Sequence, residues 1–246
     1  MKLISIVLPA YNEVERIRGT VSEILAYFGE RRLPCEVIVA ADGDDGTREA
    51  VGEMASSRTD VRVIGSKRRC GKGHGIRKAV EAAAGDVIGF TDADNKTPIT
   101  EFGKFEPWLR DGYDVVIGSR AMPESLIEQA QPLYRRCGSW GFSVFMHVCV
   151  GLHDITDTQC GFKFFRGDVA RDLFRRQHID GYMFDVEVLY LAQQIGYRIA
   201  QVGVRWRDDA DSRLDLVSGN LRNLRDVLSI RWRHRALART RPMETR

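Results

Sequence analysis

The sequence predicts an α/β fold built on one mainly parallel sheet. Over the first 120 residues, short apolar segments without a polar face alternate with segments whose apolar residues recur at helical spacing. This alternation is typical of parallel strands that helices cover on both faces. The chain has 246 residues, enough for one large domain and too few for two of ordinary size. We therefore expect a single domain over residues 1–213, followed by a C-terminal extension.

The expected elements of the first half follow in a regular order. Strands are expected at residues 3–8, 37–40, 61–65, 87–91 and 114–118, and helices at residues 14–28, from about 47, at 71–84 and at 100–110. A short polar turn separates each strand from the next helix, so that each strand and helix form one half of a βαβ unit.

Beyond residue 120 the alternation is lost. A loop is expected at residues 121–132, a helix at 133–150, a polar turn and short aromatic strand at 154–165, helices at 168–176 and 184–196, an alternating strand at 199–206 and a charged loop at 207–213.

The sequence predicts a basic amphipathic helix at residues 214–238 and a disordered tail at residues 239–246. Two interpretations of this helix stay open. The helix packs on the domain through its apolar side, or it lies on an anionic lipid surface, because arginines flank the apolar stripe and Trp232 suits the membrane interface.

The composition is that of an ordinary folded protein, with 29% charged and 43% hydrophobic residues and a net charge of +3. Lysine and arginine crowd into residues 67–78, 135–136 and 222–246, which indicates anionic partners bound locally and argues against a uniformly basic nucleic-acid-binding surface. The five cysteines form no CxxC pair, so a reduced, cytoplasmic setting is expected. We see no signal peptide and no apolar run long enough to cross a bilayer.

Two aspartates, Asp92 and Asp94, follow the strand at 87–91. Carboxylates at the C-terminal edge of a parallel strand lie beside the crevice where open α/β sheets bind ligands. Carboxylate oxygens are also the ligands that hard divalent cations prefer. The pair therefore predicts a metal ion that carries a diphosphate, with a plain acidic turn as the alternative.

A glycine-rich turn precedes the helix at 71–84, with Gly71, Gly73 and Gly75 around Lys72. Backbone N–H groups at a helix N-terminus can bind a diphosphate. The spacing matches neither the P-loop nor the dinucleotide-binding motif, so a flexible basic turn is the alternative.

Six short motifs occur in a distinctive order: VLPAYNE at 7–13, DGDDGT at 42–47, GKGHGIRKA at 71–79, TDADNKTP at 91–98, GSR at 118–120 and DTQCGFKFF at 157–165. Together they resemble the family 2 glycosyltransferases of the GT-A fold, and within them the polyprenyl-phosphate (dolichyl-phosphate) mannosyl- and glucosyltransferases. The resemblance spans residue 3 to about residue 235.

The resemblance implies an inverting, metal-dependent transferase that moves a hexose from UDP-glucose or GDP-mannose to a polyprenyl phosphate at the cytoplasmic face of a membrane. Asp92 and Asp94 would hold Mg²⁺ or Mn²⁺, which neutralises the charge that develops on the departing diphosphate. Asp94 and Arg120 would then be catalytic. The nucleotide-sugar pocket would comprise Pro9, Ala10, Tyr11, Glu13, Asp42, Lys72, Gly73, Asp92, Ala93, Gln159 and Lys163. The acceptor phosphate would contact Arg120, Arg135, Arg136 and Ser139.

Three points stay open. Asp185 would be the catalytic base if the acceptor were a hydroxyl, or it caps the helix at 184–196. Lys96 stands where some relatives carry a glutamine that assists the metal; because a charged lysine cannot coordinate a cation, we expect Lys96 to face substrate or solvent. A protein that binds a nucleotide sugar without turnover is the alternative from another class.

Overall fold

The computed structural model describes residues 3–128, 149–207 and 218–235. Over these residues a seven-stranded sheet has the order β3-β2-β1-β4-β7-β5-β8. Its strands are β1 (Ile4–Tyr11), β2 (Cys35–Asp42), β3 (Val61–Ile64), β4 (Val87–Phe90), β5 (Val115–Ser119), β7 (Lys163–Arg166) and β8 (Ile199–Gly203). β7 runs antiparallel to both neighbours, and the other pairings are parallel. The expected mainly parallel sheet is confirmed.

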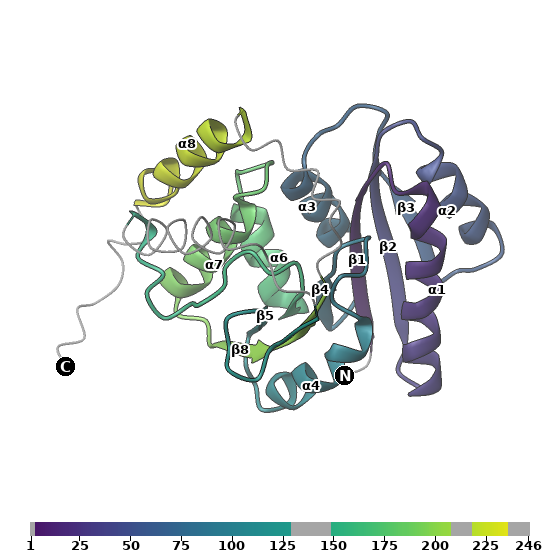
Figure 1. The fold of residues 1–246 in the computed structure, drawn as a ribbon, viewed down its shortest axis with the longest axis horizontal. Helices are drawn as coiled ribbons and strands as arrows, with labels where there is room; N and C mark the ends of the chain where they lie inside the picture. The colour runs from purple at the N-terminus through teal and green to yellow at the C-terminus, as the bar shows by residue number, and fades with distance from the viewer. Residues whose placement is uncertain (1–2, 129–148, 208–217, 236–246) are drawn as a thin grey trace.

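Helices cover both faces of the sheet (Figure 1). One face carries α1 (Val14–Glu30), α2 (Thr47–Ser56), the 3-10 turn η1 (Ile99–Glu101) and α4 (Phe102–Arg110). The other face carries α3 (Lys72–Ala82), α6 (Gly167–Arg176) and α7 (Phe184–Ile195), and α8 (Ser218–Arg233) packs on α7.

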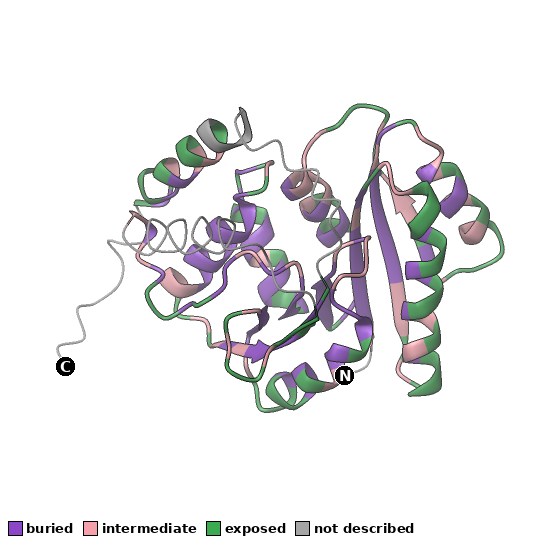
Figure 2. Ribbon diagram, viewed as in Figure 1, coloured by how far each residue is buried: buried purple, intermediate pink, exposed green. Residues whose placement is uncertain are grey.

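The strands are buried on both sides, as Figure 2 shows for the centre of the sheet. In β1, the side chains of Ile4, Ile6 and Leu8 pack with the α1 layer, and Val7 packs with the α3 layer. Successive side chains of a strand point to opposite faces, so a strand with helices on both faces needs apolar residues throughout. This requirement explains the absence of a polar face in the sequence.

The expected strand at 199–206 is wrong as a single element. β8 ends at Gly203, and a second short strand, β9 (Arg205–Trp206), leaves the central sheet and pairs with β6 (Leu126–Ile127). The change of partner falls on Val204: its N–H still donates to the carbonyl oxygen of Ser119 in β5 at 3.3 Å, while its own carbonyl oxygen accepts from the N–H of Leu126 in β6 at 3.2 Å. Most of the expected helix at 133–150, the loop at 207–213 and the tail at 239–246 lie outside the described residues.

Among the described residues, no helix combines the length and apolar character that crossing a bilayer requires.

Candidate active site

The first part of the site lies where β1 and β2 end side by side. Tyr11 is opposite Asp42 in the parallel register. The Asp42 carboxylate accepts hydrogen bonds from the N–H groups of Ser66 (3.2 Å) and Cys70 (2.7 Å), so it holds the loop between β3 and α3. That loop places the Arg69 guanidinium over the Tyr11 ring, 4.4 Å from its centroid. An aromatic ring and a cation thus flank the ends of these strands, an arrangement suited to a nucleoside.

Other residues expected in this pocket contribute mainly through the backbone. Ala10 and Ala93 are buried in the core, and the carbonyl oxygen of Ala93 accepts a hydrogen bond from the Thr20 hydroxyl at 2.9 Å. Pro9 is partly buried in β1. The N–H of Glu13 donates to the Thr47 hydroxyl at 3.0 Å, which ties the start of α1 to the start of α2.

The two aspartates after β4 each pair with a lysine. Lys72 Nζ lies 2.7 Å from Asp92 Oδ1, and Lys96 Nζ lies 3.2 Å from Asp94 Oδ2. The ammonium group of Lys96 binds the neighbouring carboxylate and its side chain is only 16% exposed, so it does not simply face solvent; whether it faces substrate stays a prediction. Burial alone would lower the pKa of Lys72, but the attraction of Asp92 and Asp185 outweighs it and raises the pKa, so Lys72 is charged.

The glycines of the turn before α3 make room for protein rather than leaving open space for a ligand. A Cβ atom on Gly73 would lie 2.5 Å from the carbonyl oxygen of Ile179 and 2.6 Å from Phe184 Cβ. A Cβ atom on Gly71, where φ is +112°, would lie 2.3 Å from the carbonyl oxygen of Asp180. The loop at 177–183 therefore packs directly on the start of α3 and directs Lys72 toward Asp92.

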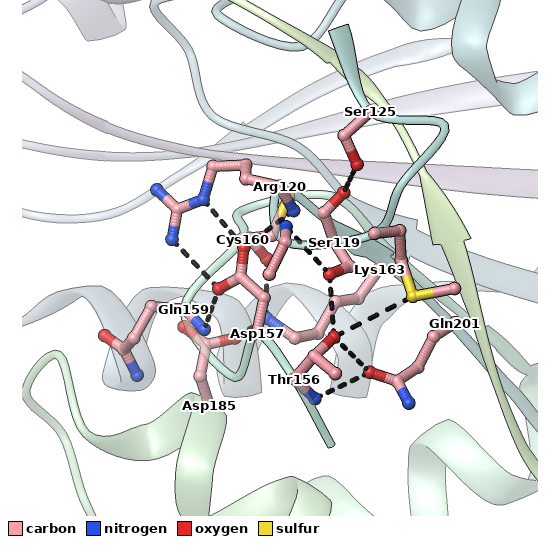
Figure 3. A network of polar contacts seen from close by, with 12 residues as sticks. Ser119, Arg120, Ser125, Thr156, Asp157, Gln159, Cys160, Lys163, Asp185 and Gln201 are labelled. Carbon is pink, nitrogen blue, oxygen red and sulfur yellow. Dashed lines mark hydrogen bonds and ion pairs between the residues drawn. The ribbon is translucent and has the colours of Figure 1, made fainter. Parts of the chain in front are cut away.

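Arg120 and Asp157 form the centre of the second part of the site (Figure 3). Arg120 Nε and Nη2 donate to the two carboxylate oxygens of Asp157 at 2.7 and 2.9 Å. Burial by itself raises the pKa of Asp157, but the ion pair and hydrogen bonds with Arg120 outweigh it and lower the pKa to about 2. Arg120 is thus held by an anion through Nε and Nη2, and among the described residues no hydrogen bond is made by its Nη1.

Lys163 and Asp185 form a buried ion pair beneath this centre. Lys163 Nζ lies 2.6 Å from Asp185 Oδ1, and the two side chains are only 1% and 4% exposed. Burial raises the pKa of Asp185 by more than Lys163 and Lys72 lower it. The alternative in which Asp185 caps α7 is wrong, because Met183 occupies the N-cap position and no side chain makes a cap hydrogen bond there.

These groups interact as one network of opposite charges. Its members are Asp92, Asp157, Asp185, Lys72, Arg120 and Lys163. Asp92 joins the two parts: its carboxylate binds Lys72, influences Arg120, and lies so close to Gly161 that a Cβ there would be 2.0 Å from Asp92 Oδ2. This network therefore balances three acids with three bases at the carboxyl edge of the sheet.

A sequence model of Glycosyl transferase family 2 matches residues 5–174, which is more than half of the chain. The chain belongs to glycosyl transferase family 2. It is an enzyme of the glycosyltransferase class, and the expected family is confirmed.

Its relatives match over nearly the whole chain. A dolichyl-phosphate beta-glucosyltransferase of Dictyostelium discoideum is 29% identical over 248 residues, covering 94% of this chain and 74% of that protein. The Homo sapiens dolichyl-phosphate beta-glucosyltransferase is 32% identical over 251 residues, covering 95% of this chain and 76% of that protein.

A solved structure shares the fold. Glucosyl-3-phosphoglycerate synthase from Mycobacterium tuberculosis, crystallised with Mn²⁺ and uridine-diphosphate-glucose, superposes with a TM-score of 0.67 at 20% identity. The match covers 94% of this chain and 79% of that chain. The GT-A fold expected from the sequence is confirmed.

In this family 2 glycosyltransferase, the donor set at Asp92 and Asp94 fits a divalent cation that arrives with a substrate. Over the described residues, no group of three histidine, cysteine or acidic side chains could hold a metal ion. A Mg²⁺-type ion bound by one or two carboxylates normally completes its shell with phosphate oxygens and water. In the structure, each of the two carboxylates is paired with a lysine, Asp92 with Lys72 and Asp94 with Lys96.

Three of the expected site residues lie outside the residues that the structure describes, and two residues of the site were not expected from the sequence. Arg135, Arg136 and Ser139 lie outside the described residues. Gln159 lies in the network: its N–H donates to Asp157 Oδ1 at 3.0 Å, and its buried Nε2 has no hydrogen-bond partner. Asp157 and Arg69 were not among the expected site residues, although the DTQCG motif and the basic run at 67–78 contain them.

Proposed function

We propose that this glycosyltransferase moves glucose from a nucleoside diphosphate sugar to the phosphate of a polyprenyl lipid of the dolichyl type, with inversion at C1. The observation that carries the proposal is the network at the carboxyl edge of the sheet, where three cations stand among three acids around the site. The relatives named above, which are dolichyl-phosphate beta-glucosyltransferases, support the same acceptor and sugar.

The chemistry needs positive charge more than it needs a base. A phosphate oxygen of the acceptor attacks C1 of the sugar, the bond from C1 to the β-phosphate oxygen breaks, and its electron pair leaves with the nucleoside diphosphate. The acceptor is already an anion at neutral pH, so correct positioning is the main requirement. We assign Lys72 to the diphosphate and the free Nη1 side of Arg120 to the acceptor phosphate, because guanidinium groups bind phosphate well.

We assign Asp92 and Asp94 to a divalent cation, Mg²⁺ or Mn²⁺. When bound, such an ion stabilises the negative charge on the leaving diphosphate as a Lewis acid. The two lysines would then be released from the carboxylates and become available to phosphate oxygens. Tyr11 and Arg69, which stack on each other, would contact the nucleoside together from one side.

The geometry gives less support to a hydroxyl acceptor with Asp185 as base. The Asp185 carboxylate is buried and already bonded to Lys163. A base must reach the proton that it removes, and this carboxylate faces the protein interior.

Two matched acceptors test the proposal. UDP-glucose, GDP-glucose and GDP-mannose are each offered with a polyprenyl phosphate or with the polyprenol of the same length, with Mg²⁺ or Mn²⁺ and with a chelator. We expect glucosyl transfer to the phosphate alone, and loss of transfer with chelator. Transfer to the polyprenol would contradict the phosphate acceptor. Full activity in chelator would contradict the metal.

A pair of variants checks the role of the carboxylate. Asp94→Asn should lower kcat by about 10²–10³-fold, the usual effect of removing a group that stabilises transition-state charge. Asp111→Asn, which removes an exposed aspartate after α4, is the matched control and should leave kcat unchanged. Equal kcat values for the two variants would exclude Asp94 from the reaction.

A further inference from the structure

α8 presents two different sides. On one side, Val227 and Ile230 are fully buried in the core shared with α7. His234, just after α8, is buried with them, and its Nε2 lies 2.7 Å from Glu187 Oε1 on α7. The domain thus covers one side of α8 through Val227 and Ile230.

The other side carries a second apolar stripe. Leu224, Leu228 and Trp232 follow at intervals of four residues, which places them on one side of a helix. They are 40%, 57% and 68% exposed, and Trp232 is the most exposed large apolar side chain among the described residues. No described part of the chain covers this stripe.

The charges around the stripe have a single sign. Arg225 and Arg231 border it at helical spacing, and Arg235 stacks on Trp232 at 5.5 Å; all three are exposed. The one acidic residue between positions 218 and 235 is Asp226. It faces the domain, with its Oδ2 3.6 Å from where a Cβ on Gly181 would stand.

We propose that the exposed side of α8 binds the surface of a bilayer that contains anionic phospholipid. Leu224, Leu228 and Trp232 would enter the boundary between headgroups and acyl chains, and the arginines would contact lipid phosphates. This occupant fits better than a second protein, because an indole ring and arginines with long apolar stems suit the membrane interface. A protein partner would have to supply acids to every side of the stripe.

The position of α8 relates this surface to the site. α8 contacts the loop at 177–183, which packs on the start of α3 beside Lys72. In the same loop the hydroxyl of Tyr182 accepts a hydrogen bond from Arg69 at 3.2 Å. Figure 1 shows α8 at the same end of the molecule as the loop between β3 and α3. A bilayer bound to α8 would therefore lie near the carboxyl edge of the sheet.

Vesicle flotation without acceptor lipid tests this inference separately from the proposed reaction. The full chain is mixed with phosphatidylcholine vesicles or with vesicles that also contain phosphatidylglycerol. We expect binding at least about tenfold tighter to the anionic vesicles, since each arginine near an anionic surface adds attraction. Leu228→Ser should weaken that binding about tenfold. Leu126→Ser is the matched control, because Leu126 is also 57% exposed but lies in β6; it should bind as the wild type does.

The charge is tested in the same assay. The double variant Arg225→Gln and Arg231→Gln should lose the preference for anionic vesicles. A control with Arg110→Gln and Arg175→Gln, which removes two exposed arginines from α4 and α6, should keep it. Three results would overturn the proposal: no binding of the wild type to anionic vesicles, equal binding of Leu228→Ser and wild type, or a dimer in sedimentation velocity that Leu228→Ser dissociates.

Discussion

At the scale of single residues, the site depends on side chains that are far apart in sequence and paired in space. Asp157 shows the energetic effect. Its ordinary pKa is 3.8, and the fold lowers the pKa to about 2. A carboxyl group whose pKa is lower in the folded than in the unfolded state stabilises the fold. The full contribution is present above the pKa of the unfolded state, and it is lost as the pH falls through the pKa of the folded state. The contribution of Asp157 is therefore about 2 kcal/mol at neutral pH and disappears between about pH 4 and pH 2.

Asp157→Asn should lower the free energy of unfolding at pH 7 by about 2–4 kcal/mol, because Arg120 is left without its buried partner. It should also flatten the loss of stability between pH 4 and pH 2. Urea unfolding at several pH values measures both effects.

The matched control is Asp60→Asn. Asp60 pairs with Arg58, but the two side chains are 47% (Arg58) and 35% (Asp60) exposed, against 30% and 8% for Arg120 and Asp157, so the loss should stay below about 1 kcal/mol. Equal losses for the two variants would show that the Arg120–Asp157 pair contributes no more than a surface pair.

The sequence alone predicted which residues lie at the site better than it predicted which of them pair with one another. Asp92, Asp94 and Lys72 stand in recognisable local motifs, so their position at the carboxyl edge could be predicted. The pairs Lys72–Asp92 and Lys163–Asp185 join residues about 20 positions apart. Such pairs depend on how helices and strands pack, and no spacing rule encodes them.

At the scale of elements, the turn before α3 shows how a correct motif can be given the wrong physical reason. The turn was expected to bind a diphosphate through its backbone N–H groups, or to be a flexible basic turn; the structure shows that Gly71 and Gly73 are required by the close approach of the loop at 177–183. That contact orients the whole start of α3, including Lys72.

Gly73→Ala should therefore destabilise the protein by about 1–3 kcal/mol, because the new methyl group meets the backbone of Ile179 and cannot be accommodated without a shift. Activity should fall with it, since Lys72 moves. Gly52→Ala in the middle of α2 is the control: nothing lies within 4 Å of its Cβ position, and alanine there should stabilise the helix by about 0.5–1 kcal/mol. Thermal unfolding measures the stability of both variants. If Gly73→Ala were as stable as Gly52→Ala, the close contact between the start of α3 and the backbone of Ile179 would be excluded.

Strand boundaries were the weakest part of the sequence-based prediction. Residues 199–206 alternate as one strand does, yet the chain changes partners at Val204 because β5 ends at Ser119. Where a strand stops is decided by the length of its neighbour, which local periodicity does not contain.

At the scale of the whole molecule, α8 is attached to the domain through one buried polar contact as well as through apolar packing. Glu187 is fully buried; its Oε2 accepts hydrogen bonds from the N–H groups of His178 (3.0 Å) and Ile179 (2.7 Å), and its Oε1 meets His234. The same acid thus fixes the loop at 177–183 and the end of α8.

His234→Ala should loosen α8 while the rest of the fold stays intact, because a buried carboxylate then loses one partner at a cost of about 1–3 kcal/mol. Hydrogen exchange measures this directly: amides of α8 should exchange at least about tenfold faster, and amides of α1, the internal control, should not change. Equal acceleration in α1 and α8 would indicate a general loss of stability, and no acceleration in α8 would show that the contact does not hold the helix.

The order of strands also has a consequence for synthesis. β7 is made after β5 but stands between β4 and β5 in the sheet. While the ribosome translates the long segment between them, Val87–Phe90 keeps one row of backbone N–H and C=O groups without a neighbouring strand. Open apolar edges of this kind are where nascent chains join one another. The nascent chain is therefore most prone to aggregation after β4 has left the ribosome and before β7 has done so. Chaperones that bind the open edge of β4 during this interval should raise the yield of folded protein most.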